Sequence, residues 1–192
     1  MRFSPAVWGA SVDELGDRYR SDQLMPAAPG RWLRAVDVAA PADAVFRRVC
    51  QLRAAPYSYD WVDNFGRRSP SQLLPWCWDL QVGDRVMTIF TLQSFEPGRE
   101  LTVTMNRGWP AGLFGDLALT YRVTPVTAGT SRLVAVARVA DAGGPVGGLR
   151  RRLLACGDLV MMRKQLLTLA RLAEADAARA TAPTDERRAS AS

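Results

Sequence analysis

The residues best suited to chemistry stand together at positions 57–64. This stretch combines two phenols, an indole, two carboxylates and an amide, contributed by Tyr57, Tyr59, Trp61, Asp60, Asp63 and Asn64. Side chains of these types offer flat apolar surface with polar tips, which suits the recognition of an amphipathic molecule. We therefore predict ligand contacts at Tyr57, Tyr59, Asp60, Trp61 and Asn64.

An alternative interpretation of the same stretch is structural. Tyr57, Trp61 and Phe65 follow one another at intervals of four residues, which is the spacing of one face of an α-helix. On this interpretation the three rings pack against a sheet, and the arginines that follow neutralise the two acids.

Catalysis by this chain would depend on few groups. The sequence has no histidine, which excludes imidazole acid–base chemistry, histidine-activated nucleophiles and the commonest metal ligand. Lys164 is the single lysine, and neither the cysteines nor the acids show the spacing of a metal site. We therefore expect no metal and no cofactor. Asp60 and Tyr59 are the candidate catalytic residues, as a carboxyl or phenol acid–base group.

The last helix offers a further polar candidate. At about 100° per residue, seven apolar side chains fall on one broad arc: Leu149, Leu153, Cys156, Leu159, Val160, Leu166 and Leu167. Arg163 lies in the middle of this arc. Because a guanidinium that faces a core needs a partner, we predict that Arg163 points inward and anchors a ligand or an internal acid, with Asp158 and Lys164 in solvent. The alternative is that Arg163 extends past its apolar stem to water.

The elements that position these residues follow from periodicity. We predict a short helix over residues 12–19, a strand over 32–38 and a helix over 42–52, whose buried face is Val45, Phe46, Val49 and Leu52. A period of two then indicates strands over 86–93, 101–106, 117–124 and 133–139, joined by turns. A long helix begins near Val146. Arg122 and Arg138, on two of these strands, are expected to face solvent on the outer surface of the sheet, and the alternative is that they line the pocket.

Composition indicates one core. A chain of 192 residues with 48% hydrophobic content suits one domain, with residues 1–30 as an N-terminal arm, 31–175 as the ligand-binding domain and 176–192 as a flexible tail. No apolar run reaches about 18 residues, which argues against a transmembrane segment. Three well-separated cysteines and an N-terminus without a continuous apolar segment favour a reduced, cytoplasmic protein.

The positive charge is concentrated near the C-terminus. The net charge is +6, and residues 147–171 hold six basic side chains against one acid. This pattern suits a solvated helix face. The alternative is an interaction protein whose basic helix contacts an anionic membrane weakly, or nucleic acid without specific recognition.

Three segments point to a family. Residues 35–46 read AVDVAAPADAVF, residues 55–61 read APYSYDW, and residues 157–167 read GDLVMMRKQLL. The first resembles the opening of the START-like helix-grip superfamily (SRPBCC), which includes polyketide cyclase-like and lipid-binding proteins, and the other two resemble one bacterial branch of it. The resemblance covers roughly residues 31–173. It implies an α+β fold in which a curved antiparallel sheet grips a long C-terminal helix around a cavity, with the 57–64 stretch near the cavity entrance.

These observations predict a binding protein. The expected ligand is a hydrophobic or amphipathic small molecule, polyketide-like, aromatic or lipid, held in the interior as by a carrier or by a metal-free cyclase- or dehydrase-like enzyme. Aromatase/cyclases of the family often use pocket histidines or acids, and this chain has no histidine to offer. A cavity filled by side chains would instead leave a structural domain. Both a monomer and a homodimer fit the sequence.

Overall fold

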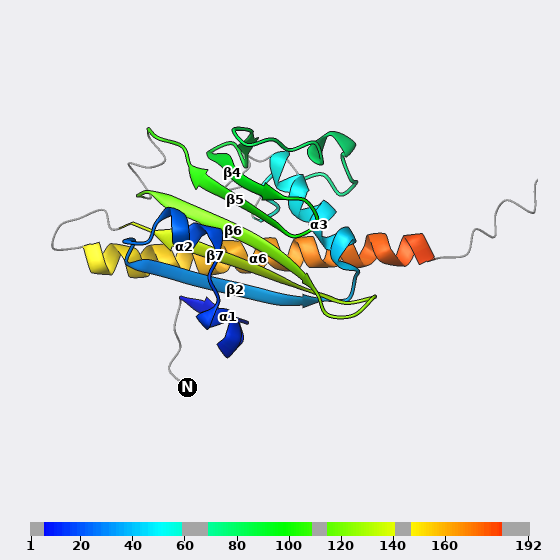
Figure 1. The fold of residues 1–192 in the computed structure, drawn as a ribbon, viewed down its shortest axis with the longest axis horizontal. Helices are drawn as coiled ribbons and strands as arrows, with labels where there is room; N and C mark the ends of the chain where they lie inside the picture. The colour runs from blue at the N-terminus through cyan, green and yellow to red at the C-terminus, as the bar shows by residue number, and fades with distance from the viewer. Residues whose placement is uncertain (1–5, 59–68, 109–114, 141–146, 182–192) are drawn as a thin grey trace, which may run out of the picture.

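The structure is a computed structural model that describes residues 6–58, 69–108, 115–140 and 147–181, without the side chains of residues 147–155 (Figure 1). Its strands are β1 (Val7–Trp8), β2 (Gly30–Val38), β3 (Arg85–Val86), β4 (Phe90–Glu96), β5 (Glu100–Met105), β6 (Leu117–Pro125) and β7 (Ser131–Val139). Its α-helices are α1 (Val12–Gly16), α2 (Arg20–Leu24), α3 (Ala42–Cys50) and α6 (Gly147–Thr181), and short 3-10 helices span Gln51–Arg53 (η1) and Pro75–Cys77 (η2).

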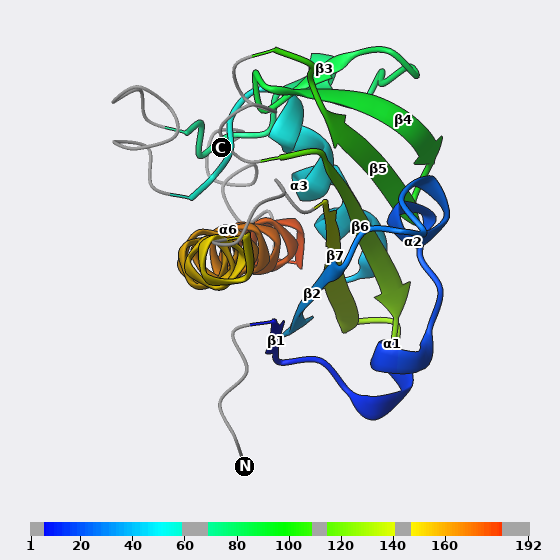
Figure 2. The same cartoon turned by 90° about the vertical axis from the view of Figure 1, so that its left-hand side faces the viewer.

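Seven strands of the described residues form one sheet, in the order β1-β2-β7-β6-β5-β4-β3. Neighbouring strands are antiparallel, except that β1 pairs in parallel with β2. The sheet is strongly curved: α3 and α6 lie on its concave face, and α1 and α2 lie on its convex face (Figures 1 and 2). The predicted α+β class and the sheet around a C-terminal helix are confirmed, with one parallel pair that periodicity did not indicate.

Alternation along β6 shows why the strands form. Leu119, Tyr121 and Val123 are buried in the main core on the concave face, whereas Thr120 and Arg122 contact the N-terminal arm on the convex face. Such alternation is what a sheet with two different faces requires. The predicted outward orientation of Arg122 is therefore confirmed, although its guanidinium contacts protein groups.

Helix α3 follows the predicted pattern. Pro41 occupies the N-cap, one residue before the first helical position. The apolar face of the helix is buried as expected, and it continues into η1: Val45, Phe46, Val49 and Leu52 are 0 to 5% exposed. This face packs against the concave side of the sheet and against α6.

The strand predicted over residues 86–93 is wrong at its start. β3 ends at Val86 and β4 begins at Phe90, because Met87 and Thr88 take left-handed backbone with φ of 49° and 66°. The Met87 N–H donates to the Leu52 carbonyl at 2.9 Å, and the Ile89 N–H donates to the Met87 carbonyl at 2.7 Å. No glycine marks this turn in the sequence, although left-handed backbone favours glycine.

Helix α6 starts one residue from the predicted position and continues to Thr181. The predicted tail boundary at residue 176 is therefore too early. The Asp176 carboxylate accepts hydrogen bonds from Arg48 Nε at 2.6 Å and Arg48 Nη2 at 2.8 Å. Because the Arg48 side chain is fully buried, this bidentate pair fixes the end of α6 against α3.

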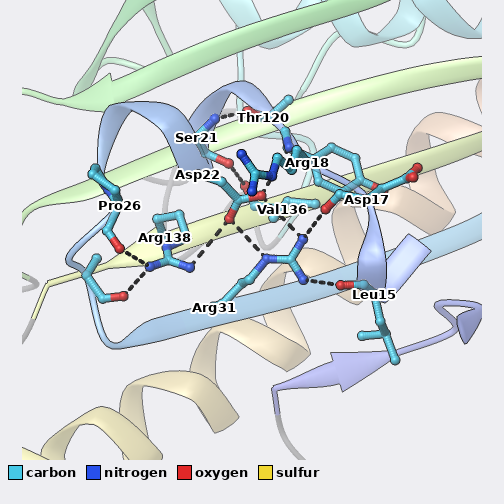
Figure 3. Close-up of polar contacts among 12 residues, drawn as sticks. Leu15, Asp17, Arg18, Ser21, Asp22, Pro26, Arg31, Thr120, Val136 and Arg138 are labelled. Carbon is cyan, nitrogen blue, oxygen red and sulfur yellow. Dashed lines mark hydrogen bonds and ion pairs between the residues drawn. The ribbon is translucent and has the colours of Figure 1, made fainter. Parts of the chain in front are cut away.

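The N-terminal arm is held on the convex face by polar contacts (Figure 3). The Asp22 carboxylate pairs with Arg31 at 3.0 Å and with Arg138 at 3.5 Å. The Ser21 N–H donates to Thr120 Oγ1 at 2.9 Å. Arg138 thus faces outward as predicted, and its charge anchors the arm.

A second group of contacts holds the start of the arm. Arg132 Nε donates to Glu14 Oε1 at 2.7 Å, and this hydrogen bond lowers the pKa of the Glu14 carboxyl. Gly9 has a φ of +70°, and a Cβ there would lie 2.1 Å from the Ala35 carbonyl oxygen. Only glycine fits so close to β2.

The short helix predicted over residues 12–19 ends early, and a second helix that was not predicted, α2, follows it at Arg20–Leu24. α1 ends at Gly16, because Asp17 takes extended backbone with φ −62° and ψ 152°. Tyr19 then occupies the N-cap of α2, and its ring is buried against the sheet.

Candidate functional site

A buried polar bridge joins the concave face of the sheet to α6. The Tyr121 hydroxyl on β6 donates to Gln165 Oε1 on α6 at 2.5 Å. Gln165 Nε2 donates to the Pro56 carbonyl at 2.5 Å and contacts the Met87 sulfur at 3.4 Å. Tyr121 and Gln165 are 0% and 3% exposed. Two polar side chains therefore meet inside an otherwise apolar core.

Tyr57 is buried in the segment that accepts the Gln165 hydrogen bond. It follows Pro56 in the chain, its side chain is 1% exposed, and it belongs to the same core as Tyr121. Its φ of 55° is unusual for a residue other than glycine. The other predicted contacts of the 57–64 stretch, Tyr59, Asp60, Trp61 and Asn64, lie outside the described residues.

The prediction that Arg163 points inward is wrong. Its side chain is exposed, and its guanidinium lies 5.4 Å from the centre of the Trp8 ring. The stripe of α6 that faces the protein is instead Asp158, Met162, Gln165, Leu166, Leu169 and Ala173. Apolar residues occur on two sides of α6, since Val160 and Leu167 are 53% and 44% exposed. The apolar arc predicted from the sequence was therefore centred on a different side of α6 from the stripe that faces the protein.

Asp158 forms the second interior ion pair of α6 and was predicted to be solvated. Its Oδ2 accepts from Arg34 Nη2 on β2 at 3.1 Å. The Arg34 side chain is 1% exposed, and its Nη1 donates to the carbonyls of Ala6 and Leu33 at 2.7 and 2.9 Å. The polar side chains on the inner stripe of α6 thus have partners. Lys164 is exposed, as predicted.

The electrostatics of these groups differ. Burial raises the pKa of Asp158 to about 6, although the Arg34 charge acts in the opposite direction. Burial, together with the Asp158 charge, raises the pKa of Tyr121 well above its ordinary value. Tyr121 is therefore a neutral hydrogen-bond donor near pH 7. The pKa of the Asp158 carboxyl therefore lies closer to neutral pH than that of an ordinary aspartate.

Sequence reasoning missed three of these four residues and misplaced the fourth. Arg34 lies between Trp32 and Val36 on the same face of its strand. An arginine on a face that is otherwise apolar could have indicated a buried ion pair. The sequence placed Gln165 on a helix and Tyr121 on a strand, but nothing in it marked either residue as part of a site. Their pairing depends on where α6 crosses β6.

The described cysteines and acids limit the kinds of catalysis that this part of the chain can support. Burial raises the pKa of the Cys50 thiol to about 12 and that of Cys77 above its ordinary value, so neither is a thiolate nucleophile at neutral pH. No group of three histidine, cysteine or acidic side chains among the described residues is arranged to hold a metal ion. None of the described helices has the length and apolar character needed to cross a membrane.

Comparison with known proteins tests the fold. No protein-family model matches the chain, and no curated protein matches it either. The solved structure of the di-domain ARO/CYC BexL, from the BE-7585A biosynthetic pathway, superposes with a TM-score of 0.50 at 19% identity. The match covers 75% of this chain and 46% of BexL, so the chain spans about half of that protein. The chain has a helix-grip fold.

Two further solved structures match the chain less closely. A Thermobifida fusca protein solved by NMR has a TM-score of 0.49 at 18% identity, over 74% of this chain and 92% of its own. The Zhui aromatase/cyclase of a Streptomyces species has a TM-score of 0.42 at 18% identity, over 81% of this chain and 97% of its own.

Proposed function

We propose that this helix-grip domain binds a hydrophobic or amphipathic small molecule, polyketide-like, aromatic or lipid, between α6 and the concave face of the sheet. The observation that carries the proposal is the buried bridge between Tyr121 and Gln165, placed in the same core as Tyr57. An apolar site with a few convergent polar groups is the usual form of a small-molecule site. The similarity in fold to BexL, an ARO/CYC protein, supports this ligand class.

The residues of the site fall into two roles. Tyr121 and Gln165 would orient a polar group of the ligand, and Tyr57, Tyr59, Asp60, Trp61 and Asn64 would contact it from the connection after α3. In a cyclase-type reaction Asp158 would exchange the proton, because its carboxyl titrates closer to neutral pH than an ordinary aspartate. Asp60 and Tyr59 are the further candidates for that role.

We expect the protein purified under native conditions to carry a small apolar molecule, visible by native mass spectrometry. In Tyr121→Phe the occupancy, or the affinity for the recovered compound, should fall about tenfold, because the loss of a buried donor removes a hydrogen bond and leaves the Gln165 oxygen unpaired.

Tyr19→Phe is the matched control. Tyr19 is equally buried but lies in the small core under the N-terminal arm on the convex face, so its substitution should leave ligand binding unchanged. If Tyr121→Phe lowers the melting temperature and leaves ligand occupancy equal to that of the control, the bridge is purely structural and the proposal fails.

A second candidate function is contact with an anionic membrane surface through the outward face of α6. Arg163, Lys164 and Arg171 are exposed there. The acids of the same helix that the structure describes are engaged elsewhere: Asp158 with Arg34, Glu174 with the Ala39 N–H, and Asp176 with Arg48. The outward face is therefore basic, with Val160 and Leu167 beside the charges.

If α6 docks on lipid, Lys164→Glu/Arg171→Glu should abolish cosedimentation with phosphatidylserine vesicles at low salt. Each basic residue near such a surface contributes about 1 kcal/mol, and the reversal replaces attraction by repulsion. Phosphatidylcholine vesicles provide the uncharged comparison. Equal binding of the wild type and the variant to phosphatidylserine would remove this candidate.

A further inference from the structure

A polar groove on the convex face is separate from the proposed ligand site. It has a volume of about 200 Å³ and lies between the N-terminal arm and the hairpin formed by β4 and β5. Its walls bring together four guanidinium groups and two carboxylates, from Arg18, Arg20, Arg99, Arg122, Glu96 and Glu100. The groove therefore carries a net charge of +2.

Arg122 forms a fixed floor for this groove. Its Nε donates to Glu100 Oε2 at 2.7 Å, and its Nη2 donates to the Arg18 carbonyl at 2.9 Å. Its guanidinium lies 4.1 Å from the centre of the Tyr19 ring, and its Nη1 is 3.8 Å from the Asp17 carboxylate. With these partners Arg122 keeps its position, and the Glu100 charge is neutralised by it.

The other three arginines are exposed at the rim of the groove. Among the described residues, no carboxylate forms an ion pair with Arg18 or Arg20, and the Arg20 guanidinium donates only to the Gln23 amide oxygen, at 2.7 Å. Arg99 lies 3.4 Å from Glu96, in a pair whose side chains are 69% and 56% exposed. Such an exposed pair is weak. Three guanidinium groups from two separate segments can therefore turn toward one anion.

We propose that this groove binds the phosphate group of a small molecule. Guanidinium groups bind phosphate through paired, charge-assisted hydrogen bonds, and a phosphate monoester offers three acceptor oxygens and close to two negative charges near neutral pH. Three rim arginines match that number of oxygens, and the net charge of the groove matches the charge of the group. The bound anion would join the N-terminal arm to the β4–β5 hairpin.

Isothermal titration with inorganic phosphate and with pyrophosphate, at constant ionic strength, tests the proposal. We expect saturable binding to the wild type and at least about tenfold weaker binding to Arg18→Ala/Arg20→Ala. The matched control is Arg85→Ala/Arg107→Ala, which removes the same charge from exposed positions on β3 and just after β5. Both variants alter exposed side chains, and circular dichroism verifies that they fold.

The outcomes separate the possibilities. Binding that the control retains and the rim variant loses supports a phosphate site in the groove. Cosedimentation with phosphatidic acid vesicles, lost in the rim variant, would assign that phosphate to a lipid headgroup, and its absence would assign it to a soluble compound. No saturable binding of either anion, an equal loss in both variants, or equally strong binding of acetate would overturn the proposal.

Discussion

Asp176→Ala is expected to lower the free energy of unfolding by about 3–5 kcal/mol, because it leaves a buried charge without its partner. The Arg48 side chain has no exposed surface, and its Nε and Nη2 both donate to the Asp176 carboxylate. Its Nη1 has no hydrogen-bond partner among the described residues. The guanidinium therefore depends on this one carboxylate, and urea denaturation of the variant measures the loss.

Two further variants make this prediction specific. Glu96→Ala removes a carboxylate from an exposed ion pair and should change the free energy of unfolding by no more than about 0.5 kcal/mol. Arg48→Met/Asp176→Leu replaces the buried pair by apolar side chains and should recover most of the stability lost in Asp176→Ala. If Asp176→Ala behaves like Glu96→Ala, the end of α6 is not fixed by this pair.

The second large effect expected is a pH dependence of the free energy of unfolding, caused by Asp158. Burial raises the pKa of Asp158 to about 6 in the folded protein, whereas an aspartate in an unfolded chain titrates near 3.9. The folded state thus binds the proton more tightly than the unfolded state. The stability that Asp158 contributes should increase as the pH falls from about 6 to about 4, and it is lost as the pH rises through 6. Because the side chain is 20% exposed, the effect should be on the order of 2 kcal/mol.

Asp158→Asn isolates this contribution. The amide oxygen still accepts from Arg34 Nη2, but it does not titrate, so the variant should be at least as stable as the wild type at pH 7 and should lose the added stability near pH 4–5. Asp37→Asn is the control, because it makes the same substitution at a side chain that is 88% exposed, and the effect assigned to Asp158 is the difference between the two variants. A wild type that loses stability relative to Asp158→Asn as the pH falls from 7 to 5 would contradict the prediction.

The elements of the fold were largely predictable because their side-chain periods are strong. The buried alternation of Leu119, Tyr121 and Val123 and the apolar face of α3 follow directly from residue types. The wrong predictions concern short segments, and they arise from local backbone conformation. The turn at Met87 and Thr88 adopts left-handed backbone without glycine, and it is stabilised by the Leu52 carbonyl, a contact that only the folded chain provides.

The candidate site was less predictable, because it depends on which stripe of α6 faces the sheet. Leucines and valines lie on more than one side of this helix, so they could not decide its rotation. The deciding residues are polar: Asp158 and Gln165 face inward because Arg34 and Tyr121 meet them there. Those partners are 124 and 44 residues away along the chain, a distance over which periodicity carries no information.

The same long separations set the order in which a nascent chain becomes a folded one. β2 pairs along its whole length with β7, and Arg48 meets its carboxylate 128 residues later in the chain. Long-range pairings of this kind fold slowly, and β2 has no antiparallel partner until β7, which begins at Ser131, has been synthesised. During synthesis the apolar sides of β2 and α3 are therefore exposed together, and this is the interval in which a chaperone has most to protect.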